Sequence, residues 1–415
     1  MTPSWADEHH EAVELYNQGT QALKQNQLDA AIDLFTRALR LDPRDHLAYN
    51  NRGIAYKRKG LLEQAIADYN RALAIKPDYE YALVNRATAR HKLGDVEGAY
   101  QDLSAVMKRG KPDSVVLTTL AMVERDRGNL DVAMKHLERA LKLNKNNLRA
   151  YQTLVDIYER QKDYSNALET CLKALKAAKD TKQQDFTAQL EAKIPSLRNA
   201  YADQLYATGL EHYRAGREKE AVRLWSRAME MNSAHLASFR DRGLVYYKTG
   251  NYTGAIADFT AAIDLDPSNA ELYRVRADAL FKIKDRERAL ADYNQALQLN
   301  PNDAVGYNNR GLVYHESNEL DKAISDYSRA ISLDATNPIF FENRAIAFIA
   351  QQQWDKGAAD YEWAIRLTAD EKRRAELLEK LALIKQPQGG RTSEALDVFA
   401  TPAPLPTNGV GRAAQ

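Results

Sequence analysis

The sequence predicts an all-α solenoid in which pairs of antiparallel helices stack one after another along the chain. The first observation is an alanine that returns every 34 residues, at Ala31, Ala65, Ala99, Ala133 and Ala167. The second is a series that resumes the same period after an interruption, at Ala221, Ala255, Ala289, Ala323 and Gly357. A fixed period of roughly 20–50 residues is typical of repeat architectures. The chain therefore contains ten repeats, in two blocks of five.

Each repeat has the pattern of a helical hairpin. Seven residues after each periodic position comes a second small residue, except at Val106. Four residues after each periodic position comes a large apolar residue: Phe35, Tyr69, Leu103, Leu137, Cys171, Trp225, Phe259, Tyr293, Tyr327 and Tyr361. These spacings put side chains on one face of a helix. Glycines such as Gly60 mark the turn between two helices, and prolines such as Pro77 close the repeat, because proline cannot continue a helix. We expect the small residues to let paired helices approach and the large ones to fill the space between hairpins.

The pattern resembles the tetratricopeptide repeat, and the residues that carry the resemblance are seen in the second repeat at Gly53, Tyr56, Ala65, Tyr69, Ala72 and Pro77. The resemblance covers residues 12–370 apart from one interruption. It implies a right-handed superhelical solenoid in which the first helix of each pair lines a concave surface. It also implies a protein that binds other proteins.

The steps between repeats set the expected boundaries. The step from Ala167 to Ala221 is 54 residues, one repeat plus an insertion of 20. We expect a flexible N-terminus at 1–11, repeats 1–5 at 12–181, a helical insertion at 182–201, repeats 6–10 at 202–370, a capping helix at 371–385 and a disordered tail at 386–415. Pro195 can begin a long first helix for the sixth repeat, and the insertion is a rigid spacer, a hinge or an extra partner contact. The tail fragment 394–400 contains Leu396, Val398 and Phe399, which could form a short docking motif.

Composition excludes several classes of function. The formal net charge is +1, which gives no general attraction to nucleic acid or to anionic membranes. No stretch approaches the roughly 18 apolar residues of a spanning helix, so we expect no membrane insertion. The acidic N-terminus lacks the basic start and the apolar run of a secretory signal, so we expect a cytoplasmic protein. The single cysteine, Cys171, falls in the apolar anchor series and is expected to be buried and inert. We find no catalytic constellation, metal-ligand cluster or phosphate loop, and expect no enzyme activity, no cofactor and no metal.

The expected partner-binding groove follows from the family resemblance. Two positions before the small residue of each first helix, asparagine recurs at Asn17, Asn51, Asn85, Asn309 and Asn343. A primary amide can donate and accept hydrogen bonds, which suits the backbone of an extended peptide, although asparagine is also a common choice of the family at this position. One turn away, the second block carries candidate selectivity residues: Tyr206, Tyr213, Arg240, Tyr247, Arg274 and Phe281. The two arginines favour an acidic segment or a C-terminal carboxylate, although a solvated face explains them equally well.

These patterns favour a non-catalytic scaffold or adaptor that holds a protein or peptide, acidic or extended, in the concave groove. One alternative is a structural protein that self-associates through its faces. Another is an accessory subunit that positions a substrate for a separate enzyme. Nucleic-acid binding is not expected, because the chain has no excess of positive charge.

Overall fold

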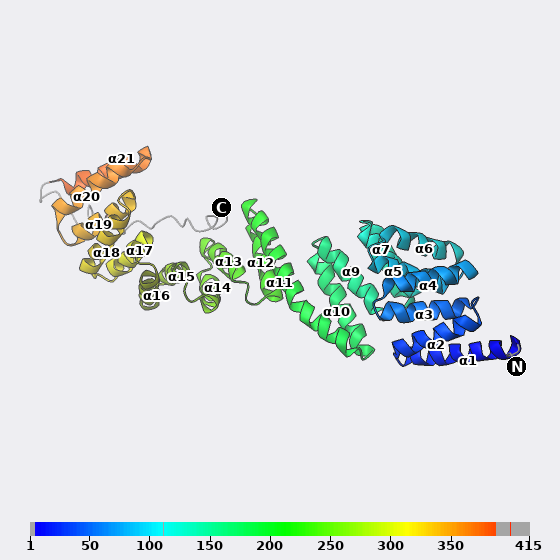
Figure 1. Cartoon of the computed structure of the whole chain (residues 1–415). Helices are drawn as coiled ribbons and strands as arrows, with labels where there is room; N and C mark the ends of the chain where they lie inside the picture. The colour runs from blue at the N-terminus through cyan, green and yellow to red at the C-terminus, as the bar shows by residue number, and fades with distance from the viewer. Residues whose placement is uncertain (1–4, 111, 387–398, 400–415) are drawn as a thin grey trace. The chain divides into compact units, whose positions relative to one another are not determined.

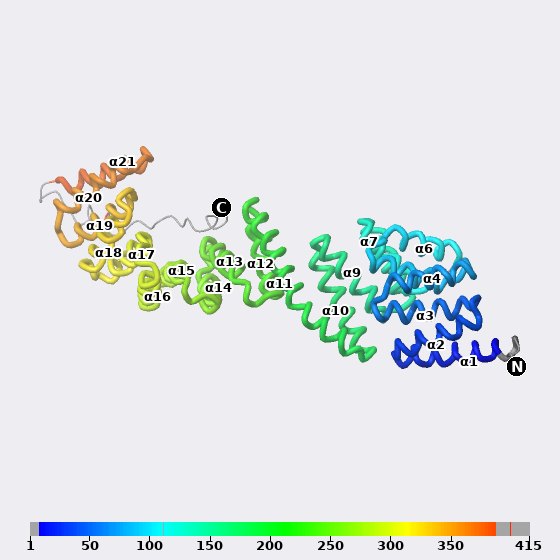
Figure 2. The backbone as a smooth tube through the Cα atoms, viewed as in Figure 1, coloured from blue at the N-terminus to red at the C-terminus, as the bar shows by residue number. Residues whose placement is uncertain are grey.

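The described residues form helices and no strands, as expected for an all-α solenoid (Figure 1). The structure is a computed structural model that describes residues 5–110, 112–386 and 399. The chain divides into two compact units, Met1–Ala200 and Tyr201–Gln415, which we call unit 1 and unit 2. Within each unit, consecutive helices pack as hairpins, and Figure 2 traces their backbones. The predicted stack of antiparallel helix pairs is confirmed.

Unit 1 contains five hairpins in the order of the five predicted repeats. Its helices are α1 (Trp5–Lys24), α2 (Leu28–Leu41), α3 (His46–Arg58), α4 (Leu62–Ile75), α5 (Glu80–Lys92), α6 (Val96–Arg109), α7 (Ser114–Asp126), α8 (Leu130–Leu143), α9 (Leu148–Arg160) and α10 (Tyr164–Asp180). Residues 5–11, which we expected to be flexible, belong to α1. A single helix, α11 (Gln184–Arg214), contains the boundary between the units.

Unit 2 continues from the C-terminal half of α11. Its further helices are α12 (Glu218–Met231), α13 (Leu236–Lys248), α14 (Tyr252–Leu265), α15 (Ala270–Lys282), α16 (Arg286–Leu299), α17 (Ala304–Glu316), α18 (Leu320–Leu333), α19 (Pro338–Ala350), α20 (Trp354–Leu367) and α21 (Glu371–Ile384). The helix α21 lies where the sequence suggested a capping helix. Its Leu377, Leu381 and Ile384 are buried in a cluster with Tyr361 of α20.

The second repeat shows why the chain turns where it does. Asp45 caps α3, because its carboxylate accepts hydrogen bonds from the backbone N–H groups of Leu47 and Ala48. Between α3 and α4, Gly60 has φ +81°, a conformation that glycine adopts without steric cost. The same cap and turn, with other residues in places, recur along both units. Local sequence therefore sets the length of each helix.

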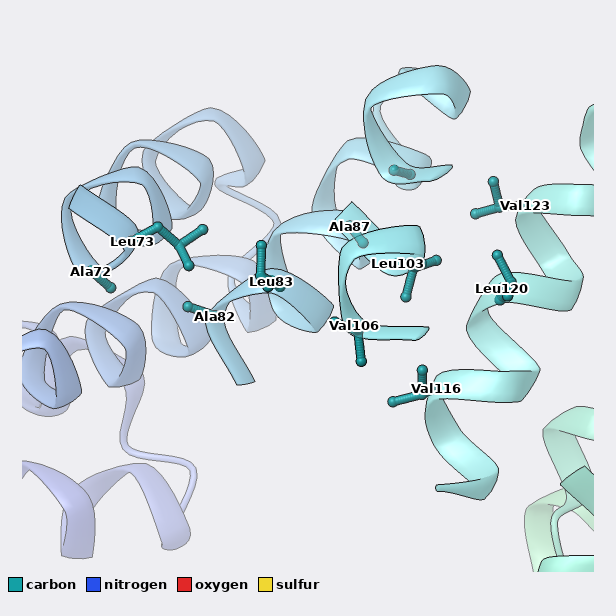
Figure 3. Close-up of a cluster of buried hydrophobic side chains, with 11 residues drawn as sticks. Ala72, Leu73, Ala82, Leu83, Ala87, Leu103, Val106, Val116, Leu120 and Val123 are labelled. Carbon is teal, nitrogen blue, oxygen red and sulfur yellow. The ribbon is translucent and has the colours of Figure 1, made fainter. Parts of the chain in front are cut away.

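Close helix packing explains the small residues. A Cβ atom built on Gly53 would lie 2.6 Å from the ring of Tyr69, which is fully buried between α3 and α4. Ala65 and Ala72 of α4 are also fully buried. Figure 3 shows how the next hairpin joins the core: α4, α5, α6 and α7 contribute to one cluster that includes Leu73, Leu83, Leu103, Val106, Val116 and Leu120. Each hairpin thus buries its apolar face against its neighbour.

The helix α11 is not broken at Pro195, although a proline can interrupt a helix. The helix continues through Pro195, whose side chain is exposed. Proline removes one backbone hydrogen bond, and the helix is sustained by the bonds on either side and by packing. Leu190 and Leu197 are buried, and Lys193 forms an ion pair with Glu159 of α9 at 2.7 Å. The N-terminal half of α11 therefore packs on unit 1 as one further helix.

Of the expected tail, the structure describes Gln386 and Phe399, and the other residues of 386–415 lie outside the described residues. The Phe399 ring is buried in the cluster around α21 and meets the Tyr361 ring edge-on, with 5.9 Å between the ring centroids. Leu396 and Val398 of the candidate docking motif are among the residues that the structure does not describe. Phe399 therefore contributes to the core at the C-terminal end of unit 2.

Candidate partner-binding surface

The first helices of successive repeats form one continuous face in each unit. In unit 1, α1, α3, α5, α7 and α9 contact one another in turn, and in unit 2 so do α13, α15, α17 and α19. Successive second helices approach one another less closely. A stack whose first helices are closer together than its second helices curves with the first helices inside. We call this side the inner face of each unit.

The asparagines of unit 1 bond to one another across repeats. Asn51 of α3 donates to the Tyr16 hydroxyl of α1 at 3.1 Å. Asn50 donates to the Asn51 carbonyl oxygen at 3.2 Å, and Asn85 of α5 donates to the Asn50 oxygen at 3.1 Å. Lys57 completes the chain by donating to the Asn85 oxygen at 2.7 Å. The amides therefore link three neighbouring first helices, which leaves each of them fewer donors and acceptors for a ligand.

Unit 2 contains a second network of the same kind. Asn343 of α19 donates to Asn308 of α17 at 2.9 Å, and Asn308 donates to Asn309 at 3.1 Å. Asn309 in turn donates to the Asp278 carboxylate of α15 at 2.9 Å. Asn343 is completely buried, with 0% of its surface exposed, whereas Asn17 at the equivalent position of the first repeat is exposed. The predicted asparagine positions thus range from enclosed to open.

The two arginines that suggested an acidic ligand already have carboxylate partners inside the protein. Arg240 donates to Asp241 at 2.7 Å, and Asp241 also accepts a hydrogen bond from the Tyr206 hydroxyl at 2.7 Å. Burial, together with the neighbouring Asp241 charge, raises the pKa of Tyr206, so its hydroxyl remains a donor. Arg274 lies 3.3 Å from Asp303 and 3.5 Å from Asp278. Internal carboxylates therefore balance the positive charge on this face of unit 2.

The aromatic residues predicted for the groove of unit 2 are half-buried. The ring of Tyr213 packs against that of Trp225 with 6.0 Å between centroids, and Tyr247 packs against Tyr252 at 5.5 Å. Phe281 packs against the cores of two neighbouring repeats. Each ring thus contributes to the fold and exposes only part of its surface.

Sequence reasoning missed a pair of charges that crosses each of six hairpins. An arginine of the first helix forms a two-point ion pair with an aspartate of the second helix sixteen residues later: Arg52–Asp68, Arg86–Asp102, Arg242–Asp258, Arg276–Asp292, Arg310–Asp326 and Arg344–Asp360. The aspartates are buried or nearly so. The signal was present, because each arginine precedes the small residue of the first helix and each aspartate precedes the large apolar anchor. Each of these ion pairs joins the first and second helices of one hairpin.

Sequence reasoning also missed Lys57, a half-buried cation that faces other cations. Among the described residues, its ammonium group donates one side-chain hydrogen bond, to the neutral Asn85 amide oxygen at 2.7 Å. Burial, together with the nearby charges of Lys92, Arg58 and Arg149, lowers the pKa of Lys57 to about 8.

Cys171 is buried, and burial raises the pKa of its thiol, which disfavours the reactive thiolate. Within the described ranges, no three His, Cys, Asp or Glu side chains are grouped to hold a metal ion. None of the helices in those ranges is both long enough and apolar enough to cross a membrane.

The family models that match the chain describe tetratricopeptide repeats. Models described as "Tetratricopeptide repeat" match residues 16–80 and 304–337, one described as "TPR repeat" matches 243–284 and 277–318, and one described as "Psidin, N-terminal TPR repeats region" matches 58–188. A comparison with curated proteins found no match.

The chain is also similar, at low sequence identity, to several solved structures. Yeast Tom70 is 17% identical, with 93% of this chain and 98% of that chain covered and a TM-score of 0.40. The Pseudomonas aeruginosa protein pilF is 18% identical, with 48% and 91% covered and a TM-score of 0.41. MamA from Desulfovibrio magneticus RS-1 is 20% identical, with 40% and 94% covered and a TM-score of 0.39.

Proposed function

Because the chain belongs to the tetratricopeptide-repeat family, we propose that it is a scaffold or adaptor, without catalytic activity of its own, that holds segments of partner proteins on the inner faces of its two units. The observation that supports this most is the continuous row of first helices in each unit. Such a row presents the same helix faces at a regular step, which suits an extended or helical protein segment.

An experiment on unit 1 compares two double variants that change similar side chains on different helices. The inner-face variant is Tyr81→Ser with Lys92→Glu, both exposed on α5. The control is Val132→Ser with Lys135→Glu, both exposed on the second helix α8. Affinity capture from the native host, with mass spectrometry, should show partners that the control retains and the inner-face variant loses. Equal capture by both variants would place partner binding elsewhere.

The matching experiment on unit 2 reverses charges without changing the net charge. The inner-face variant is Glu271→Lys with Lys282→Glu on α15, and the control is Glu287→Lys with Arg288→Glu on α16. All four side chains are exposed, so both variants should keep the helical circular dichroism and thermal midpoint of the wild type. Partners lost only from the α15 variant would assign binding to the inner face of unit 2.

Self-association is the competing function, because unit 1 exposes several large apolar side chains. Sedimentation equilibrium of the purified chain over a hundredfold range of concentration separates the two. A scaffold that awaits a partner keeps the mass of one chain. Growth of mass with concentration, reversed by Tyr81→Ser, would favour self-assembly over the proposed function.

A further inference from the structure

A row of exposed apolar side chains crosses the first helices of unit 1. Val13, Leu47, Tyr81 and Val115 occupy equivalent positions of α1, α3, α5 and α7, one repeat apart. Tyr81 is 71% exposed and Val115 is 60% exposed. Exposed apolar side chains that lie in a row, rather than scattered singly, are typical of interaction sites. We call these four residues the apolar row.

Unit 2 does not repeat this row. The equivalent positions there are occupied by Asp203, Ala237, Glu271, Val305 and Ile339. Val305 and Ile339 are half-buried, and Asp203 and Glu271 are charged. The apolar row is therefore a property of unit 1 and not a consequence of the repeat itself.

Cations lie at the other end of the same helices. Lys24, Arg58 and Lys92 follow Val13, Leu47 and Tyr81 by eleven residues. Eleven residues make three helical turns, so each cation shares a helix face with its apolar residue and lies about 16 Å from it along the helix. Lys57 lies beside Arg58 at this end of α3. We call Lys24, Lys57, Arg58 and Lys92 the cation row.

The cation row has no internal counter-ion among the residues that the structure describes. In the part of the chain that the structure describes, no carboxylate oxygen lies within 4.0 Å of any of its four charged groups. Arg58 donates to the Leu23 carbonyl oxygen at 3.0 Å, and Lys57 donates to Asn85. Both of these partners are neutral.

Lys57 stands out among the half-buried cations of the protein. Every other half-buried lysine or arginine in the described ranges lies within 4.0 Å of a carboxylate: Arg52, Arg86, Arg90, Arg125, Lys193, Arg240, Arg242, Arg274, Arg276, Arg286, Arg310, Arg344, Arg373 and Lys380. A charge held away from water without a counter-ion is unfavourable in the free protein. A bound anion would remove that penalty.

We propose that the inner face of α1, α3 and α5 binds a protein segment in which apolar side chains precede or follow a cluster of carboxylates by about five extended residues, the span of the 16 Å between the two rows. The apolar side chains of the segment pack on the apolar row, and its carboxylates bind the cation row, with one of them paired to Lys57. The proposal rests on the proposed function and assigns the chemistry of the partner to unit 1 alone.

The test uses the full-length chain and a fluorescein-labelled synthetic peptide. The peptide carries two leucines and a phenylalanine, then five glycine and serine residues, then four glutamates. One control peptide replaces the glutamates by glutamine, and a second replaces the apolar residues by serine. Fluorescence anisotropy should show saturable binding of the first peptide, with affinity about tenfold weaker for each control. Equal binding of the glutamine peptide would overturn the proposal.

Two single substitutions locate the site. Lys57→Met should weaken binding of the acidic peptide by about tenfold or more, since a hydrogen bond to a charged group is lost from a half-buried site. Lys135→Met, which removes an exposed cation of α8, should change the affinity less than twofold. If Lys57→Met binds the peptide as tightly as the wild type, the site is not at Lys57.

A third substitution leaves Lys57 in place and supplies it with an internal carboxylate. Asn85→Asp puts a negative charge where the Asn85 oxygen now accepts the Lys57 hydrogen bond, so the variant should fold and lose affinity for the acidic peptide. Asn146→Asp makes the same change in charge at an exposed position of unit 1 and should leave the affinity unchanged. Unaltered binding by a folded Asn85→Asp variant would contradict the proposal.

Other outcomes separate this inference from the proposed function. If a single-stranded DNA 10-mer binds as tightly as the peptide and depends equally on Lys57, the site binds anions in general. That result would overturn the proposal that its ligand is a protein segment. If the peptide does not bind but host partners are still lost from the Tyr81→Ser, Lys92→Glu variant, the proposed function stands and the partner chemistry inferred here is wrong.

Discussion

Arg52 and Asp68 join the two helices of the second repeat through two short hydrogen bonds, Nε to Oδ2 at 2.7 Å and Nη2 to Oδ1 at 2.8 Å. The same guanidinium donates to the Thr36 hydroxyl of the preceding repeat at 3.0 Å. The Arg52 side chain therefore links three helices: α3, which carries it, α4 of the same hairpin, and α2 of the preceding repeat. A planar, always charged group with five donors suits this position better than lysine would.

The first prediction concerns the arginine pair in the middle of unit 2. Arg276→Ala should lower the free energy of unfolding of unit 2 by about 3–5 kcal/mol, because Asp292 is left nearly buried without its partner. Arg276→Met combined with Asp292→Leu should recover most of that loss. Urea unfolding followed by circular dichroism measures both.

The exposed ion pair between Arg223 and Glu220 is the control for that comparison. Arg223→Ala should change the unfolding free energy by less than about 1 kcal/mol. A loss at Arg276 no larger than the loss at Arg223 would show that the pairs that cross the hairpins contribute little to stability.

The second prediction concerns the contact between Gly53 and Tyr69. Gly53→Ala should destabilise unit 1 by about 1–3 kcal/mol, because the added methyl group would overlap a ring that has no room to move. In an exposed helix the same substitution would stabilise the protein by up to about 1 kcal/mol. A destabilising effect would therefore show that the overlap with the Tyr69 ring outweighs the gain in helix propensity. Thermal unfolding at one scan rate is the measurement. A Tyr69→Leu background, which relieves the overlap, should reduce the loss.

The repeats could be predicted from the sequence because their signal is local and recurs. Small residues such as Ala65, large anchors such as Tyr69 and turn residues such as Gly60 each reflect a steric demand within one hairpin or between two neighbours. These demands return every 34 residues, so each repeat confirms the others. The all-helical fold, the paired helices and the stacking order follow from them.

The roles of the polar residues could not be predicted in the same way, because they depend on partners in other helices. Asn17 and Asn343 occupy equivalent positions, and one is exposed while the other is enclosed and bonded to Asn308. Arg240 looked available for an acidic ligand, but its neighbour Asp241 holds it. Exposure and charge balance are properties of the folded unit, and only the structure shows that no carboxylate of the described residues pairs with Lys57.

The third prediction compares those two asparagines. Asn343→Ala should cost about 1–3 kcal/mol, because it leaves the buried Asn308 oxygen without its donor. Asn17→Ala should cost less than about 0.5 kcal/mol, since its side chain is in water. Thermal unfolding of the two variants side by side tests this difference. Equal effects would mean that the amide network of unit 2 is not a stabilising feature.

The fourth prediction concerns Phe399. Phe399→Ala should open the end of unit 2 by removing a ring that covers Tyr361, with a local loss of about 3 kcal/mol in the free energy of opening. Hydrogen exchange should then quicken in α20 and α21 and remain unchanged in unit 1. Leu378→Ala, at a half-exposed position of α21, should have a much smaller effect. Unchanged exchange in the Phe399 variant would show that the ring adds nothing to this core.

The fifth prediction links stability to pH through Lys57. Burial and the neighbouring Lys92, Arg58 and Arg149 charges lower its pKa to about 8 in the folded protein, well below the ordinary value near 10.4 that holds in the unfolded chain. The folded state therefore releases the proton first, and the wild type should gain stability as the pH rises from 8 to about 10. Below pH 8 the full penalty is present, so Lys57→Met should be more stable than the wild type by about 1–2 kcal/mol at pH 7.

The advantage of Lys57→Met should shrink as the pH rises from 8 towards 10, because Lys57 is then neutral in the folded state while the unfolded chain still holds its proton. Urea unfolding of both proteins at pH 7, 8, 9 and 10 measures this. The result separates two roles for the residue. If Lys57 only supports the fold, its replacement should lower the stability of the free protein. If Lys57 is kept for an anionic partner, it should destabilise the free protein and stabilise the complex. A Lys57→Met variant less stable than the wild type at pH 7 would therefore argue against a partner site at Lys57, whatever the peptide measurements show.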